Sequence, residues 1–298
     1  MTNKFNVYEA ITANIITALE AGVAGAKLPW HVSSTANLIP VNAVTGKEYG
    51  GSNVMNLWVT AHIKSYSSNR WATFKQWAEI GATVKKGEKS TVGIFFSTFE
   101  KEGKNGAVER VPVARAFWLF NAAQVEGDVN APAPAPLADL TTRIAAADAA
   151  IAATGAAIIE GGCTAYYRPS TDEVNIPVRE AFTGTETSSA TEGYYSTLLH
   201  ELAHWTGAKK RLDRKLGNAF GSEGYALEEL VAELAAAFLC ARLGISNEPR
   251  ADHAQYLGSW LKALKNDNRA IVQAASAASK ASDYILAYSA PQEAALAA

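Results

Sequence analysis

The spacing of apolar residues in the first part of the chain predicts a mixture of helices and strands. Apolar side chains recur at helical spacing over residues 5–22, at Val7, Ile11, Ile15 and Leu19. Two further helices are expected over 54–66 and 73–80. Two runs rich in aromatic and β-branched residues, 91–100 and 111–121, enclose a charged, glycine-containing stretch. This arrangement is typical of a β-hairpin, so we expect a compact α+β unit.

The second part of the chain is dominated by helical patterns. An alanine-rich helix is expected over 138–153, followed by three short strands at 156–160, 164–169 and 173–178. Four helices complete the prediction: one that carries residues 197–207, then 225–243, 252–266 and 268–288. Gly244 is placed to end the longest of them, because glycine readily adopts the left-handed conformation of a helix C-terminus.

A stretch of alternating alanine and proline separates these two parts. The sequence VNAPAPAPLAD at 129–139 cannot enter a sheet interior or begin a helix before Leu137. We therefore predict a fold of the α+β class with two domains. Their expected bounds are residues 1–128 and 138–298, joined by an Ala/Pro linker at 129–137.

Composition indicates the cellular compartment of the protein and a difference in charge between the two predicted domains. The chain has 298 residues and 48% hydrophobic content, which is enough for a sizeable core in each domain. Its two cysteines are too few for a disulfide framework, and no apolar run approaches the roughly 18 residues of a membrane span. We expect a cytoplasmic protein with no membrane partner. Residues 1–128 carry 13 Lys and Arg against 10 Asp and Glu, and the remainder carries 14 against 19, so the first domain is the better candidate for a polyanion.

The strongest chemical signal is the sequence HELAH at residues 200–204. His200 and His204 are four residues apart, so on a helix they lie about 40° from each other and can direct one nitrogen each at one ion. Glu201 beside them is the expected catalytic base, accepting a proton from a metal-bound water. The alternative is a purely structural helix end, with His204 near the C-terminal dipole and His200 in the core. The apolar surroundings of this helix favour the metal, because buried polar groups need partners.

A catalytic zinc site requires a third protein ligand, and the helix at 225–243 offers acidic residues. At 100° per residue, Glu229 and Glu233 share one face of an otherwise apolar helix. We predict Glu229 as the third ligand and Glu233 as acceptor for the outer N–H of a ligating histidine, with the reverse order also open. Glu228, about 100° away, is expected to be solvated, and His253 is a weaker candidate ligand. Zinc is the expected ion, although Mn²⁺ or Co²⁺ suits the same residues.

These motifs resemble a known group of metallopeptidases. AYYRPSTDEVNIPV, YYSTLLHELAHWTG and YALEELVAELAAAF are similar to the zincin-like metallopeptidase domain found in ArdC-type antirestriction proteins, over about residues 160–243. The resemblance implies a peptidase that takes a protein as substrate. In zincins a peptide lies along an edge strand above the active-site helix, and the resemblance puts EVNIPV near that role.

Basic and aromatic residues alternate in the first domain. The stretch NRWATFKQWAEIGATVKKGEKS mixes lysines and arginines with aromatic rings, which suits single-stranded nucleic acid because bases stack on rings while cations neutralise phosphates. The candidate contact residues are Arg70, Trp71, Lys75, Trp77, Lys85, Lys86 and Lys89. The alternative is that Trp71, Phe74 and Trp77 form an ordinary core stripe.

The first domain also resembles part of a known family. LPW, NAVTGKEYGGSNVMNL and RWATFKQWAEIGATVKKGEKSTVGIFF are similar to the N-terminal domain of ArdC-type proteins, over about residues 5–122. The resemblance implies an antirestriction protein of a conjugative plasmid that binds single-stranded DNA without strong sequence preference and protects incoming DNA from host restriction. It leaves open whether the metal domain cleaves a host protein or is not proteolytic. The competing hypothesis is a metallopeptidase with no role in nucleic-acid binding.

Overall fold

The computed structural model describes most of the chain, and its helices and strands follow the predicted order. The described residues are 5–23, 30, 39–102, 108–127, 138–184, 188–216, 221–246 and 253–289. The helices are α1 (Val7–Val23), α2 (Ser52–Lys64), α3 (Phe74–Glu79), α4 (Leu140–Ala153), α5 (Ala190–Thr206), α6 (Glu223–Leu243), α7 (His253–Asn266) and α8 (Ala270–Ala287). The strands are β1 (Val41–Asn42), β2 (Arg70–Ala72), β3 (Thr83–Val84), β4 (Thr91–Glu102), β5 (Val108–Asn121), β6 (Val125–Glu126), β7 (Ala157–Glu160), β8 (Tyr166–Arg168) and β9 (Glu173–Ile176). The predicted α+β class is confirmed, and the predicted linker at 129–137 lies outside the described residues.

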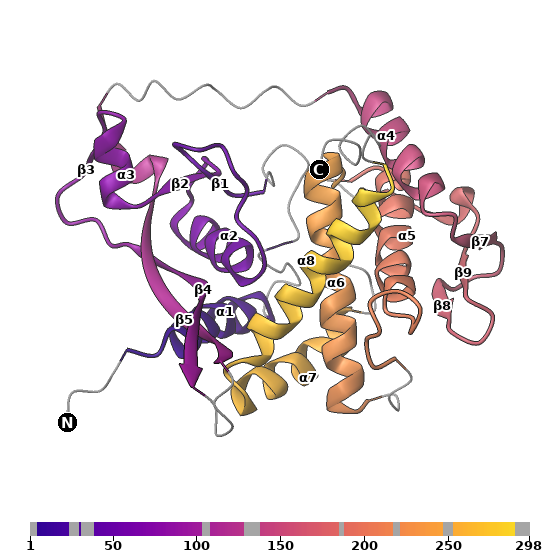
Figure 1. Ribbon diagram of the computed structural model, residues 1–298. Helices are drawn as coiled ribbons and strands as arrows, with labels where there is room; N and C mark the ends of the chain where they lie inside the picture. The colour runs from indigo at the N-terminus through magenta and orange to yellow at the C-terminus, as the bar shows by residue number, and fades with distance from the viewer. Residues whose placement is uncertain are drawn as a thin grey trace.

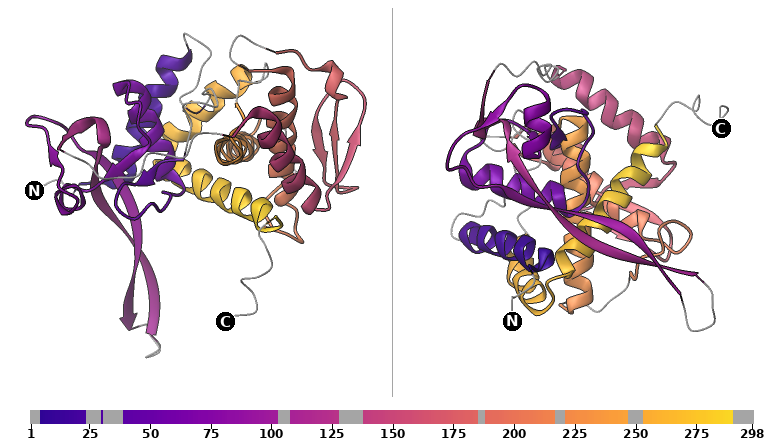
Figure 2. Two further views of the ribbon diagram at one scale, coloured as in Figure 1. Left: turned by 90° about the horizontal axis from the view of Figure 1, so that it is seen from above. Right: turned by 60° about the vertical axis from the view of Figure 1, so that its left-hand side comes forward.

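The first half of the chain is built around a four-stranded sheet. Its strand order is β1-β2-β5-β4, and β4 pairs with β5 as the predicted antiparallel hairpin over its whole length, from Thr91↔Leu119 to Glu102↔Val108. The end of this hairpin extends away from the rest of the molecule (Figure 2). One face of its base packs on the helices through Ile94, which is buried. The exposed outer part of the hairpin therefore leaves several apolar side chains in contact with solvent.

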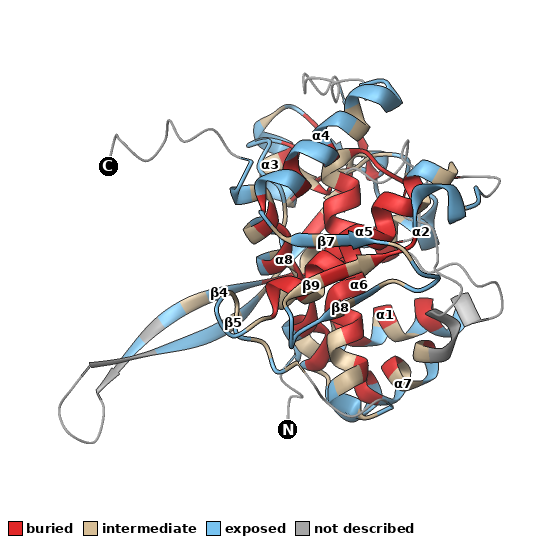
Figure 3. Ribbon diagram, turned by 90° about the vertical axis from the view of Figure 1, so that its right-hand side faces the viewer, coloured by how far each residue is buried: buried red, intermediate tan, exposed pale blue. Residues whose placement is uncertain are grey.

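The second half surrounds a central helix with other helices and a small sheet. In Figure 1 the helices α5 and α8 lie beside α6, and the sheet β7-β9-β8 lies on the outer side of α5. Figure 3 shows this sheet in front of the buried helices. Fourteen of the residues of α6 are buried, because its apolar residues occupy more than one face of the helix.

Local sequence signals fix the ends of the two helices that matter most. Ser189 begins α5 with a capping box, in which its hydroxyl accepts from the backbone N–H of Glu192 and the Glu192 carboxylate accepts from Ser189. Ser222 begins α6 in a similar way, and Gly244 ends it in the left-handed conformation with φ 69°. The lengths of both helices, and hence the facing positions of their polar residues, are thus set by the sequence itself.

The largest cluster of buried residues in the described part of the chain joins its two halves. This cluster includes side chains of α1 and α2 together with side chains of α6, α7 and α8. Trp58 of α2 packs on Phe238 of α6, with ring centroids 5.6 Å apart. Polar contacts cross the same boundary, including the Thr12 hydroxyl, which donates to the Asn268 carbonyl over 2.7 Å. The two predicted domains therefore pack firmly on each other instead of being joined by the linker alone.

None of the helices in the described part of the chain combines the length and the apolar character that crossing a membrane requires.

Candidate metal centre

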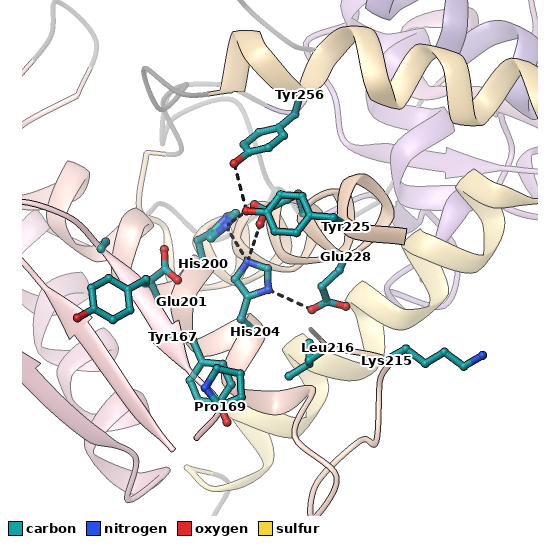
Figure 4. Close-up of a pocket in the computed structure, with 13 residues that line it drawn as sticks. Tyr167, Pro169, His200, Glu201, His204, Lys215, Leu216, Tyr225, Glu228 and Tyr256 are labelled. Atoms are coloured by element: carbon teal, nitrogen blue, oxygen red, sulfur yellow. Dashed lines mark hydrogen bonds and ion pairs between the residues drawn. The ribbon is translucent and has the colours of Figure 1, made fainter. Parts of the chain in front are cut away.

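The two histidines of the HELAH sequence face each other across one turn of α5. Both Nε2 atoms point into the same space and lie 3.2 Å apart (Figure 4). His200 is only 4% exposed. In the absence of a bound ion, one imidazole can donate to the other across this distance, depending on the tautomer.

Helix α6 brings Glu229 to the same point. Its two carboxylate oxygens lie 3.5 Å from His200 Nε2 and 3.7 Å from His204 Nε2. Two ligand atoms bound at about 2.0–2.1 Å to one tetrahedral ion are separated by about 3.3–3.4 Å. The spacings of 3.2, 3.5 and 3.7 Å are close to this value, and His200, His204 and Glu229 form a converging group of metal-ligating side chains. The residues present fit a divalent cation.

Carboxylates also approach the outer nitrogen of each imidazole. Glu233 Oε2 lies 3.6 Å from His200 Nδ1, and Glu228 Oε1 lies 3.1 Å from His204 Nδ1. The expectation that Glu228 is solvated is wrong, since its side chain is only 13% exposed. Arg214, from the loop after α5, holds the same carboxylate with two hydrogen bonds of 2.8 and 3.0 Å. This loop covers the side of α6 that a helical wheel assigns to solvent.

The carboxylates and imidazoles of this cluster stabilise one another's charged forms. Burial opposes protonation of His204, but the carboxylates of Glu228 and Glu229 outweigh it and raise the pKa of His204 to about 10. Burial likewise opposes ionisation of Glu229, but its hydrogen bonds with His200 and His204 hold the pKa of Glu229 well below its usual range. The carboxylates therefore favour the protonated form of His204, and a divalent cation held by these residues would compete with that proton.

A cavity of about 300 Å³ opens onto these side chains. Glu201 lines it beside His200 (Figure 4) and is 3% exposed. Tyr225, one turn before Glu229 on α6, also lines the cavity, and its hydroxyl lies 3.3 Å from that of Tyr256. Burial raises the pKa of Tyr225, and its hydrogen bond with Tyr256 and the charge of Glu229 raise it further, so it remains a neutral donor. Tyr225 was not among the site residues predicted from the sequence, although its place one turn before Glu229 puts both residues on one face.

The edge of the cavity is formed by β8. The strand order β7-β9-β8 puts β9, which carries most of EVNIPV, in the middle of the sheet. The expectation that EVNIPV lies at the substrate edge is therefore wrong, because both sides of β9 are already paired. Tyr166 and Tyr167 of β8 line the cavity instead. Local periodicity identifies a strand but does not reveal its position within the sheet.

The predicted nucleic-acid contacts fall into two groups. The four lysines of the set are exposed, at positions 75, 85, 86 and 89. Trp71 and Trp77 are 1% and 0% exposed, and the Trp77 indole donates to the Phe120 carbonyl over 2.9 Å. Neither ring offers a face to a base, which corrects the prediction for these two residues. Phe74, which the core-stripe alternative buried with them, is 60% exposed.

Two further candidates from the sequence are Arg70 for nucleic acid and His253 for the metal. Arg70 is half-buried on β2. The side chain of His253 lies outside the described residues, so the structure adds nothing to its weaker candidacy as a ligand.

Comparisons with known proteins cover both halves of the chain. Residues 5–121 match the family described as the N-terminal domain of anti-restriction factor ArdC. Residues 145–277 match the zincin-like metallopeptidase family. A protein of Sinorhizobium fredii named uncharacterized protein y4eC is 40% identical, over 94% of this chain and 91% of that protein. DNA primase TraC of Escherichia coli is 39% identical over 94% of this chain, which spans only 27% of the primase.

Two solved structures are similar to this chain over almost its whole length. The metal-free crystal structure of the antirestriction ArdC protein from plasmid R388 has a TM-score of 0.77 and 37% identity, over 96% of this chain and 98% of that chain. The Mn(II)-bound structure of that protein has the same TM-score and identity, over 97% of this chain and 100% of that chain. The chain therefore belongs to the ArdC family of antirestriction proteins, with an N-terminal ArdC domain followed by a zincin-like metallopeptidase domain.

Proposed function

We propose that this protein protects incoming plasmid DNA from host restriction in the cytoplasm, by binding single-stranded DNA and by hydrolysing a host protein at the metal centre. Family membership supports the antirestriction role. The observation that carries the hydrolytic part is the convergence of His200, His204 and Glu229 beside Glu201 in one cavity. Zinc is the proposed ion, and the Mn(II)-bound relative makes manganese a second candidate.

Each side chain of the cavity has a separate role in this proposal. A bound divalent ion would supply Lewis acidity and a water whose pKa is lowered to about 7. His200, His204 and Glu229 would hold the ion. Glu201 would accept the proton of the attacking water and pass it to the leaving amine. Tyr225, neutral because of its burial, would donate a hydrogen bond to the oxygen of the peptide group under attack.

A peptide substrate would add as a strand to β8. This strand is at the edge of its sheet, and its residues Tyr166 and Tyr167 line the cavity. Backbone hydrogen bonds would then hold an extended peptide with little dependence on its side chains. The expected substrates are therefore flexible or unfolded segments of proteins.

The change Glu201→Gln tests the hydrolytic part. It removes the proposed base and leaves all three proposed ligands in place, so metal content should remain near one ion per chain while cleavage of an unfolded protein falls to background. Metal content is measured by elemental analysis and cleavage by gel electrophoresis. Unchanged cleavage would exclude Glu201 as the base.

The same variant separates two accounts of antirestriction. A second candidate function is protection by binding alone, with the metal domain as a scaffold, and the core shared by the two halves favours it because α6 and α8 support α1 and α2. Plasmid transfer into a restricting host is compared for wild type and Glu201→Gln. Loss of protection supports hydrolysis, and full protection supports binding alone.

Binding of single-stranded DNA is tested on the full chain. Anisotropy of a labelled oligonucleotide should show binding at low salt that weakens steeply as salt rises, because phosphate contacts release counterions. Absence of binding at low salt would favour a metallopeptidase with no nucleic-acid role.

A further inference from the structure

A second hollow, of about 710 Å³, lies between the two halves of the chain. Its walls come from α1, the hairpin strand β4, the loop after α5, and α8 with the residue before it. We call it the junction groove, and the residues that matter for its chemistry are Tyr8, Phe96, Arg211, Arg214, Arg269 and Lys280. It is separate from the metal cavity, and no residue lines both.

The junction groove is strongly basic. Four of its lining residues are Arg or Lys, and no Asp or Glu lines it in the part of the chain that the structure describes. This contrasts with the whole chain, whose net charge is −2. A groove lined by one sign of charge attracts ligands of the opposite sign. Its ligand is therefore expected to be an anion with several charges.

Two of the four cations are already occupied by partners within the protein. Arg211 forms an ion pair with Asp172 and lies over the Trp205 ring, 3.8 Å from its centroid. Arg214 is held by Glu228 and by the Ala203 carbonyl. Their positions are fixed by these contacts, so they contribute a positive field more than new hydrogen bonds.

The other two cations are available to a ligand. Arg269 and Lys280 are exposed, and among the described residues neither forms an ion pair with a carboxylate, although Arg269 also lies over the Tyr8 ring. Arg269 precedes α8 and Lys280 lies on it, eleven residues later, which is about 16 Å along a helix. Two cations this far apart can each contact a different phosphate of one nucleic-acid strand.

Aromatic rings complete the groove. Phe96 of β4 lines it and is 55% exposed, although it is a large apolar side chain on a strand. Tyr8 lines it from α1, with the Arg269 guanidinium 5.3 Å from its ring centroid. An exposed ring at Phe96 and a half-buried one at Tyr8 thus lie beside exposed cations. This combination suits a single strand, because bases stack on rings while cations follow the backbone. An acidic peptide would match the charge but would make no use of the rings.

We propose that the junction groove is the main single-stranded DNA site of this protein, with Arg269 and Lys280 on phosphates and Phe96 under a base. The proposal rests on the proposed DNA-binding function and moves its site away from the lysines around α3. It also brings the strand close to the metal centre. Residues 211, 212 and 214 line the groove, while the next two residues of that loop line the metal cavity.

The test compares matched variants of the full chain, using anisotropy of a labelled 20-nucleotide oligo(dT) in 0.1 M salt. Arg269→Gln with Lys280→Gln removes two charges from the groove, and Lys75→Gln with Lys86→Gln removes two from the surface around α3. With a slope of about −0.7 per phosphate contact, loss of two contacts should weaken binding about 25-fold and reduce the salt slope by about 1.4. The variant at positions 75 and 86 should change both much less.

A second pair of variants tests the contribution of base stacking separately from that of charge. Phe96→Ala should weaken binding roughly five-fold or more, whereas Phe74→Ala, which removes an equally exposed ring outside the groove, should not. Equal thermal unfolding temperatures and metal content confirm that each variant is folded.

The possible outcomes separate the inference from the function on which it rests. Wild-type affinity in the groove variants, with losses at positions 75 and 86, would overturn the inference and leave DNA binding intact. No binding by the wild type would overturn both. Displacement of the oligonucleotide by poly-glutamate at equal charge concentration would assign the groove to an acidic peptide and also overturn the inference.

Discussion

The contact between Glu228 and His204 gives the sharpest prediction about the metal centre. In the structure the Glu228 carboxylate approaches His204 Nδ1 at 3.1 Å and accepts from Arg214 at 2.8 and 3.0 Å, with its side chain only 13% exposed. A carboxylate on Nδ1 keeps the proton on that nitrogen and leaves Nε2 free to bind a metal. The change Glu228→Gln keeps the shape of the side chain but removes this preference.

The expected loss of metal affinity in Glu228→Gln follows from the number of hydrogen-bond donors around this side chain. The carboxylate accepts on both oxygens, whereas an amide has one oxygen and one NH₂ group. Whichever way the amide is turned, its NH₂ group faces either His204 or Arg214, both of which donate. A hydrogen bond to a charged group contributes about 1.5–3 kcal/mol. Since 1.4 kcal/mol is a factor of ten, metal affinity should fall about 10- to 100-fold.

The assay is a competition titration of metal-free protein with Zn²⁺ and a chromophoric chelator. The matched control is Glu223→Gln, a change of the same kind in the exposed first turn of the same helix, which should leave affinity unchanged. A Kd for Glu228→Gln within two-fold of the wild type, in a variant that unfolds at the normal temperature, would refute the role assigned to this contact.

Three other predictions concern the ligand order, the core and acid stability. Glu229→Ala should abolish Zn²⁺ binding in the same titration while Glu233→Ala retains it, and the opposite result would reverse the ligand order. Phe238→Ala should lower the free energy of unfolding by about 3–5 kcal/mol in denaturant titrations, because it empties the packed space between the two halves, and a loss under 1 kcal/mol would contradict a shared core. The bond from Arg211 holds the pKa of Asp172 below its usual range, so this pair stabilises the fold at neutral pH and the stability is lost as pH falls below about 4. The difference in unfolding temperature between wild type and Asp172→Asn should therefore be present at pH 7 and shrink towards pH 3, and a constant difference would contradict the linkage.

The sequence was informative wherever a local pattern decides the structure. Capping residues determine where α5 and α6 begin, and helical periodicity then puts Glu229 and Glu233 on one face. The face-to-face arrangement of these residues with His200 follows once α5 and α6 pack together. Few other ways of packing α5 against α6 would bury these carboxylates and imidazoles together, because both helices are apolar on most of their surface.

The sequence was uninformative wherever distant contacts decide. Glu228 is largely shielded from solvent because Arg214, fourteen residues earlier, bonds to its carboxylate. Trp71 has the same neighbours in the sequence whether it faces a base or the core, and it is buried because β2 is enclosed between β1 and β5. A basic and aromatic composition is therefore ambiguous until packing is known.

The shared core changes how the two halves can act together. Two domains on a flexible linker would meet at an effective concentration set by the length of that linker. Here α1 and α2 pack on α6 and α8, and one loop separates the junction groove from the metal cavity. A strand held in the groove and a peptide held at β8 would then lie at a fixed separation and orientation. Cleavage would then be restricted to proteins that can reach β8 while the strand is bound. Such geometry would favour substrates that themselves sit on the incoming DNA over proteins free in solution, and lengthening the predicted Ala/Pro linker at 129–137 should leave that preference unchanged.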